Sequence, residues 1–205
     1  MALSGLFLII FLLQHFIINI TSVFSESIFN QFSHFMGKNF VVQFIAQPIL
    51  IFGVIFHFVM GFYLEIQNTR ATKYAYHKEM GSANSSWMSR NMIWSGLAIL
   101  SFLVLHFIDF WIPEMNHKYV EFLPDDPNRY YEELVDKFEA PWRVSLYCVS
   151  FVLLSMHLLH GFSSALKSMG ANKYYSKFIK SFIHIYSIGI PLGFCFIALY
   201  HFLSH

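Results

Sequence analysis

Five long apolar stretches dominate the hydrophobic pattern of this chain, and shorter polar segments separate them. The stretches cover approximately residues 3–23, 41–66, 91–112, 142–166 and 181–203. A helix needs about 20 consecutive apolar residues to cross the hydrocarbon core of a bilayer, and each stretch has roughly that length. The pattern therefore predicts an all-α fold, an integral membrane bundle of five transmembrane helices.

The composition is also that of a membrane protein. Of the 205 residues, 56% are hydrophobic and only 12% are charged, whereas about 25% of the residues in a soluble domain are charged. Few residues lie outside the five stretches, so we expect residues 1–205 to form a single membrane domain without a soluble globular part. A net charge of +1 argues against a nucleic-acid partner, which would need a basic stripe.

The charges of the connecting segments predict the orientation. Lys and Arg are concentrated in the connections 67–90 and 167–180, whereas the connection 113–141 is rich in Asp and Glu. Because Lys and Arg favour the cytoplasmic side, we expect the N-terminus and both basic connections inside, and the acidic connection and the C-terminus outside. The first stretch lacks the basic start and the cleavage site of a signal peptide, so we expect a retained helix.

Prolines mark two places where the pattern is less regular. In the acidic connection, Pro124 and Pro127 precede the charged amphipathic segment RYYEELVDKF. This segment forms either a short surface helix or a solvated connector, and we favour the connector. In the last apolar stretch, Pro191 predicts a kink or a local opening of the helix.

A histidine lies near the middle of each of the first four apolar stretches. These residues are His15, His57, His106 and His157. An ionisable ring inside a bilayer is costly, so each of them marks a candidate functional site. Imidazole is a usual axial ligand of haem iron, and four such residues could hold two haems.

An internal repeat relates these histidines. The segments SGLFLIIFLLQHFI (4–17) and SGLAILSFLVLHFI (95–108) share Ser, Gly, Leu, Phe, Leu, His, Phe and Ile at equivalent positions, and HFVMGF (57–62) and HLLHGF (157–162) share the pattern H-x-x-x-G-F. A duplicated helical hairpin, convergence on one ligand geometry and chance similarity of Phe- and Leu-rich segments all explain the repeat. The shared histidine positions favour the first two explanations.

The depth of each histidine in the membrane predicts how they pair. The first and third helices run outward, and their histidines lie roughly 18–22 Å from the inner face at about 1.5 Å per residue. The second and fourth helices run inward, and their histidines lie roughly 24 Å from the outer face of a core about 30 Å thick. We therefore expect His15 and His106 to share an outer level, and His57 and His157 to share an inner level about 15 Å away. Helix bundles build cofactor sites from side chains that face each other in this way.

Other residues are candidates for the surroundings of a haem. Gly61 and Gly161 lie one turn after a histidine, where a small residue admits either a flat macrocycle or a neighbouring helix. His160 is a candidate partner of a haem propionate and a rival ligand to His157. Lys167 and Arg143 are candidate cations for the propionates of the inner and the outer haem, or interfacial residues.

A quinone site would need a proton-exchanging group beside an apolar cleft. The polar residues at the outer ends of the first two helices are candidates: Asn30, Gln31, His34, Gln43 and Gln47. Ordinary solvent contacts explain these residues equally well.

Several motifs of this chain resemble the dihaem cytochrome b anchor of succinate:quinone oxidoreductases, the succinate dehydrogenases and fumarate reductases. They are QHFIIN around His15, FNQFSHFMGKNF before the second apolar stretch, HFVMGFYL from His57 and HLLHGFSSAL from His157. The resemblance covers all five stretches. It implies two haem b groups, with His15 and His106 ligating the outer one and His57 and His157 the inner one.

The resemblance also implies the partners and the reaction. A flavoprotein subunit and an iron–sulfur subunit would bind at the cytoplasmic face of a bacterial cytoplasmic membrane, and electrons would pass between them and a quinone, expected to be menaquinone. The chain would be the electron-transfer and quinone part of the enzyme, without dicarboxylate chemistry, and the complex could form a higher oligomer. Ser155 occupies the position where some members of the family carry a glutamate that serves proton transfer, and the polar segment usual before the first helix is missing.

Two alternatives remain open at this stage. The chain could be the cytochrome b subunit of another respiratory dehydrogenase, a hydrogenase or a formate dehydrogenase. It could also be a transporter whose histidines relay protons or bind a metal ion. Transporters usually have discontinuous helices at their sites, whereas the four histidines here lie within unbroken apolar stretches.

Overall fold

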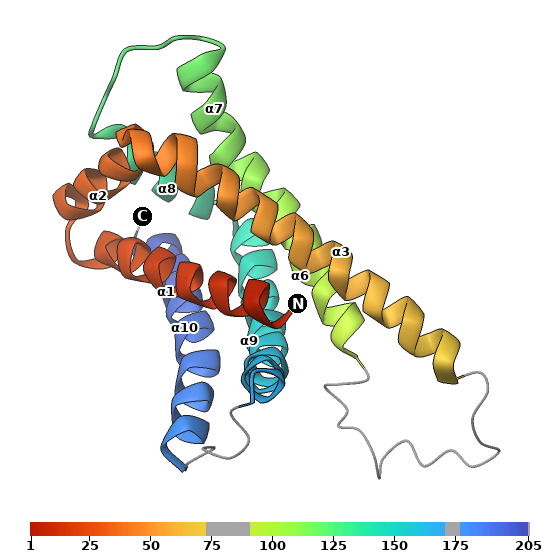
Figure 1. Cartoon of the computed structure of the whole chain (residues 1–205). Coiled ribbons are helices and arrows are strands. Elements are labelled where there is room, and N and C mark those ends of the chain that lie inside the picture. Colours follow the sequence, from red (N-terminus) through yellow and green to blue (C-terminus); the bar gives the residue numbers. More distant parts are fainter. Residues whose placement is uncertain (73–90, 171–176, 205) are drawn as a thin grey trace.

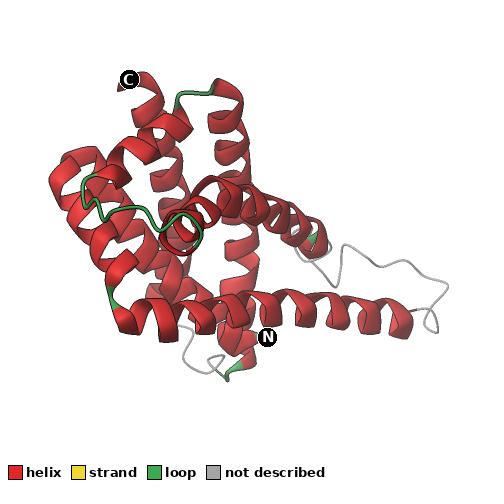
Figure 2. Ribbon diagram, turned by 90° about the horizontal axis from the view of Figure 1, so that it is seen from above, coloured by secondary structure: helices red, strands yellow, loops and turns green. Residues whose placement is uncertain are grey.

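The computed structural model describes residues 1–72, 91–170 and 177–204, and this part of the chain contains helices and no strands (Figure 2). The all-α prediction is confirmed. In chain order the elements are α1 (Ala2–Phe24), α2 (Glu26–Lys38), the π-helix η1 (Val42–Ala46), α3 (Gln47–Thr72), α6 (Met92–His106), the π-helix η2 (Phe107–Trp111), α7 (Ile112–Tyr119), α8 (Arg129–Phe138), α9 (Pro141–Ser168) and α10 (Lys177–Ser204).

Five helices in the described ranges are long and apolar enough to cross a membrane, so the chain is a multi-pass membrane protein. They are Ala2–Phe24, Val42–Arg70, Met92–Tyr119, Pro141–Ser168 and Lys177–Ser204. The third span ends at Tyr119 instead of near residue 112. Its helix continues through η2 into α7, and Pro113 lies just after η2, at the junction of the two helices.

The two ends of the bundle differ in their connections. The C-terminal ends of α3 and α9 and the N-terminal ends of α6 and α10 lie at the lower side of Figure 1, while α2, α7 and α8 lie at the upper side. The lower side is where the basic connections begin and end. Lys73, Lys78, Arg90 and Lys173 of those connections lie outside the described residues.

The acidic connection folds into a helix, so the expectation of a solvated connector was wrong. One face of α8 buries Leu134, Val135 and Phe138 against the bundle, while its charged face carries Glu132, Asp136 and Lys137. The strong separation of apolar and charged faces allows this short helix to gain stability from packing rather than from its length.

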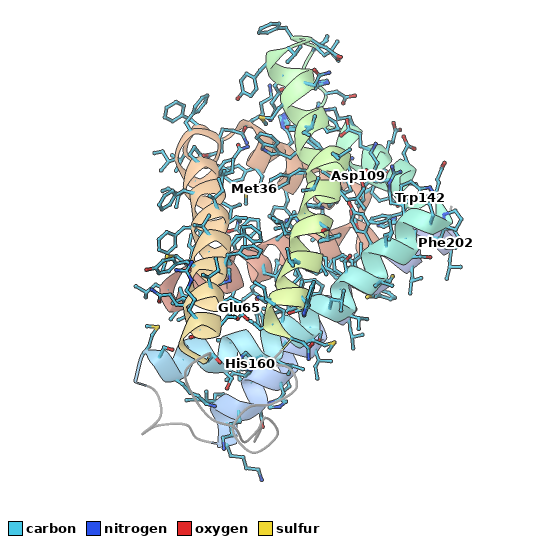
Figure 3. All side chains as sticks on the ribbon, turned by 90° about the vertical axis from the view of Figure 1, so that its right-hand side faces the viewer. Met36, Glu65, Asp109, Trp142, His160 and Phe202 are labelled. Atoms are coloured by element: carbon cyan, nitrogen blue, oxygen red, sulfur yellow. The ribbon has the colours of Figure 1, made fainter. Side chains whose placement is uncertain are left out.

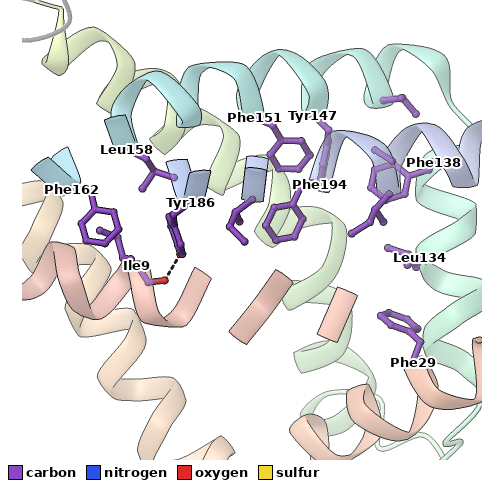
Figure 4. Close-up of a cluster of buried hydrophobic side chains, with 14 of the residues drawn as sticks. Ile9, Phe29, Leu134, Phe138, Tyr147, Phe151, Leu158, Phe162, Tyr186 and Phe194 are labelled. Atoms are coloured by element: carbon purple, nitrogen blue, oxygen red, sulfur yellow. Dashed lines mark hydrogen bonds between the residues drawn. The ribbon is translucent and has the colours of Figure 1, made fainter. Parts of the chain in front are cut away.

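The core lies between α9 and α10, which run side by side (Figure 1), and α1 crosses both of them. Figure 4 shows a row of aromatic side chains in this core, including Phe151 and Phe194, whose stacked rings have centroids 5.3 Å apart. The hydroxyl of Tyr186 on α10 donates a 2.5 Å hydrogen bond to the carbonyl of Ile9 on α1. This bond ties α1 to the core at a point where its backbone is locally buried.

Pro191 does not interrupt α10, which runs as one helix from Lys177 to Ser204. Proline lacks the N–H that would bond the carbonyl of Ser187 one turn earlier. Both residues are buried in the core, and the helix continues without a break through this turn.

Gly193 allows α10 to approach α1. A Cβ atom at position 193 would lie 2.5 Å from Cζ of Phe16, whereas a Cβ at Gly189 on the same helix meets nothing within 4 Å. We therefore expect Gly193→Ala to destabilise the protein by about 1–3 kcal/mol, a typical cost of overpacking, and to shift Phe16 and its neighbour His15. Thermal unfolding in detergent measures this effect. Gly189→Ala is the matched control, and equal stability of the two variants would contradict the prediction.

Candidate functional site: two histidine pairs

The structure brings His15 of α1 and His106 of α6 together. Their ring centroids are 5.7 Å apart and their planes are nearly perpendicular, at 88°. The ring centroid of Phe194 lies 5.7 Å from that of His15, and Phe102 stacks on His106 with ring centroids 5.8 Å apart. We call these two histidines the outer pair. Both imidazoles are half-buried and lie against these aromatic rings of α6 and α10.

The other two histidines form a second pair, the inner pair. The ring centroids of His57 on α3 and His157 on α9 are 6.5 Å apart, with an interplanar angle of 69°. The histidines therefore pair as their depths in the membrane predict, and each pair joins equivalent positions of the repeat. His160 forms its side-chain hydrogen bond with Ser164 one turn further along α9, at 3.3 Å, and does not replace His157 beside His57.

The distance between the two pairs follows from the helices that join them. A Cβ at Gly5 would lie 3.3 Å from Cε1 of His57, and His15 lies ten residues after Gly5 on the same helix. Ten residues of α-helix span about 15 Å. Gly96 contacts His157 in the same way and precedes His106 by ten residues, so α6 gives the same separation of about 15 Å.

The spacing within each pair suits an iron ion between the two rings. Metal–imidazole nitrogen bonds are about 2 Å long, so an ion between two opposed imidazoles holds the ring centroids roughly 6 Å apart. The observed centroid distances of 5.7 and 6.5 Å lie on either side of this value. Each pair would supply two ligands to such an ion, and a porphyrin would supply four more. Among the described residues, no third His, Cys, Asp or Glu completes a metal-binding group.

The hydrogen bonds of the two pairs differ. In the inner pair, Nδ1 of His57 lies 3.2 Å from Oγ of Ser4, and Nδ1 of His157 lies 3.2 Å from Oγ of Ser95. In the outer pair, the amide of Asn19 lies 3.4 Å from both ring nitrogens of His15 and donates mainly to the carbonyl of that residue. Nδ1 of His106 is buried without a hydrogen-bond partner among the described residues.

The two glycines predicted to admit a macrocycle have equivalent surroundings. A Cβ at Gly61 would lie 3.4 Å from the methyl group of Met1, and a Cβ at Gly161 would lie 3.3 Å from that of Met92. The ends of methionine side chains move easily, so the space beside each glycine is adaptable. Lys167 is exposed at the end of α9. Its role toward a propionate stays a prediction.

Arg143 takes part in a buried network beside the outer pair. Its Nε lies 3.3 Å from Oδ2 of Asp109, and the same carboxylate accepts a 2.9 Å hydrogen bond from Tyr147. The ring of Tyr147 lies 6.3 Å from that of His106. Asp109 belongs to η2, and its side chain is only 2% exposed. The proposed contact of Arg143 with a propionate stays a prediction, and its partner in the structure is this aspartate.

Asp109 lies three residues after His106 of the outer pair, and His160 lies three residues after His157 of the inner pair. Figure 3 shows Asp109 and His160 at different heights in the bundle. The role of Tyr147 was not predicted from the sequence. A tyrosine in an apolar stretch gives no signal by itself, because only the helix packing shows that its hydroxyl meets a buried carboxylate.

Three of the predicted quinone residues line one pocket at the upper side of the bundle. Asn30, Gln31 and His34 of α2 face Pro127 and Asn128, the residues before α8. The amide oxygen of Asn30 accepts a 2.8 Å hydrogen bond from the backbone N–H of Tyr131, so it also joins α2 to α8. Nε2 of His34 lies 3.2 Å from Asp125. Gln47 begins α3 and does not line this pocket.

An ionic cluster joins α7 to α8 beside this pocket. Glu114 pairs with Lys118 and Arg129, and Gln43 lines the adjoining cavity. Burial, together with the negative charge of Glu114, raises the pKa of Tyr130 to about 12. The phenol therefore keeps its proton at neutral pH and remains a hydrogen-bond donor in this cluster.

No known protein family, curated protein or solved structure matches this chain.

Proposed function

We propose that this chain is the membrane anchor and dihaem cytochrome b subunit of a succinate:quinone oxidoreductase. One observation carries the proposal. Two imidazole pairs, each with a spacing that suits iron, occupy two levels of a membrane-spanning bundle and are contributed by four different helices. The resemblance of the motifs around these histidines supports the assignment to this enzyme.

The chain's own residues would serve this function in three ways. His15 and His106 would bind one haem, and His57 and His157 the other. Haem iron supplies one-electron redox chemistry when it is bound. Phe102, Tyr147, Phe194 and the remaining aromatic side chains would exclude water, and Gly61 and Gly161 would leave room for a flat ring system near the inner pair.

The partners would bind at opposite sides of the membrane. We propose that a flavoprotein and an iron–sulfur subunit bind at the basic, cytoplasmic side of a bacterial cytoplasmic membrane, near the inner pair. The quinone, which we expect to be menaquinone, would bind at the outer side, in the pocket lined by Asn30, Gln31 and His34. There His34 would exchange protons with the quinone, and Asp125 would orient its imidazole.

The test is to purify the chain with its native partners and to ask which electron donor reduces it. We expect flavoprotein and iron–sulfur subunits to copurify and succinate to reduce the haem bands. Reduction by hydrogen or formate, but not by succinate, would assign the chain to the other class of respiratory dehydrogenase. A preparation without haem bands would leave a histidine-dependent transporter as the better explanation.

A further inference from the structure

The hydroxyl groups of Ser4 and Ser95 each make two hydrogen bonds, and both serines make the same two. Ser4 donates to the carbonyl of Met1 at 2.8 Å, and Ser95 donates to the carbonyl of Met92 at 2.9 Å. Each hydroxyl also lies 3.2 Å from Nδ1 of an inner-pair histidine on another helix. These serines are the first residues of the two repeated sequence segments. The two copies of the repeat therefore make the same contacts in the structure.

The first of these bonds determines the direction of the second. A serine hydroxyl has one proton to donate and two lone pairs to accept with. The proton is committed to the backbone carbonyl three residues earlier, so the oxygen can only accept from the imidazole. Nδ1 of His57 and of His157 must therefore carry a hydrogen. A neutral imidazole protonated on Nδ1 has its free lone pair on Nε2, which is the atom then available to a metal.

The glycine after each serine lets the imidazole lie against the helix. A Cβ at position 5 would come within 3.3 Å of Cε1 of His57, and a Cβ at position 96 within 3.8 Å of Cε1 of His157. The Ser-Gly pair thus combines a hydrogen-bond acceptor with the space that the ring needs to reach it.

We propose that Ser4 and Ser95 are positioning residues that hold His57 and His157 in the Nδ1–H form and orient Nε2 of each toward a metal ion. This proposal rests on the haem function proposed above. It applies to the inner pair alone, since Asn19 only partly contacts His15 and His106 has no partner on Nδ1 among the described residues. A hydrogen bond of this type fixes the ring orientation and makes the ligand a better electron donor.

The first measurement reads the tautomers directly. In the purified chain freed of haem, with ¹⁵N-labelled histidine rings, we expect the NMR shifts of Nδ1–H imidazole for His57 and His157, because iron bound to Nε2 would by itself fix this form. Ser4→Ala should release His57, and Ser95→Ala should release His157, to a mixture of tautomers. This measurement does not depend on haem. An Nε2–H form of either ring in the unaltered haem-free protein would overturn the proposal, even if the same protein binds two haems when haem is supplied.

The second measurement follows the haems of the same variants. We expect each Ser→Ala change to raise the midpoint potential of the inner haem, because a weaker donor ligand favours ferrous iron. The potential of the outer haem should stay unchanged. Haem retention should weaken about 10-fold or more. Ser→Thr, which keeps the hydroxyl, should restore both properties.

The matched control is Ser101→Ala on α6, whose hydroxyl donates to the carbonyl of Leu97 in its own helix, at 3.0 Å. It should change neither the potentials nor haem retention. Equal effects of Ser101→Ala and Ser95→Ala would show that the serines act only on helix stability and would overturn the positioning role. The expected tautomers in a protein that binds no haem would contradict the proposed function and leave the hydrogen-bond assignment standing.

Discussion

Replacing either His15 or His106 by alanine is expected to remove the same single haem, so that each variant retains about half of the haem of the unaltered chain. The two residues are 91 positions apart in the sequence, yet their ring centroids are 5.7 Å apart. Loss of one imidazole would leave the iron with a single protein ligand beside Phe102 and Phe194. The inner haem should persist, because its ligands lie about 15 Å away.

Haem content per polypeptide, from the spectrum of the dithionite-reduced protein, measures this effect. Added imidazole should partly restore the lost haem, since it replaces the missing ligand. The control is His184→Ala on α10, where the ring is exposed and bonds the carbonyl of Lys180 in its own helix. Loss of different haems in the two outer-pair variants would contradict the pairing.

His57→Ala and His157→Ala are expected to remove the other haem and, in addition, to abolish quinone reduction by succinate. The inner pair lies toward the side where the basic connections begin, which is the side we propose for the iron–sulfur subunit. Succinate oxidation with a soluble dye as acceptor should continue, because the dicarboxylate chemistry belongs to the flavoprotein partner. The comparison of quinone and dye activities in one preparation measures this difference.

His160→Ala separates the two candidate ligands of α9. His160 bonds Ser164, whereas the ring of His157 faces that of His57. We therefore expect His160→Ala to keep both haems and more quinone activity than His157→Ala. If His160→Ala lost the inner haem and His157→Ala kept it, the assignment of the inner pair would be wrong.

Hydropathy and the alternating direction of the helices predicted the five spans and the pairing of the histidines. Long apolar stretches fixed the number of candidate spans, and the alternating direction of the helices predicted which histidines share a level. The close approach of His15 to His106, and of His57 to His157, agrees with that pairing. Their ligation of haem stays a prediction, as do the roles of Gly61, Gly161, His160, Lys167 and Arg143.

Contacts between distant segments were not predicted from the sequence. The segment Arg129–Phe138 looked like a solvated connector because half of its residues are charged, but its apolar face packs on the bundle. The serines of the repeat looked like ordinary small residues until the structure placed each beside an imidazole of another helix. Asp109 and Tyr147 meet for the same reason, since helix packing and not local sequence determines which polar atoms share a buried space.

The number of haems bound by one unaltered chain tests the central claim most directly. Quantitative haem extraction, combined with protein determination on the purified chain, should give two haem b groups per polypeptide, both low-spin by EPR because each iron has two imidazole ligands. A chain that binds no haem, or only one, would contradict the account of two histidine pairs as two haem sites.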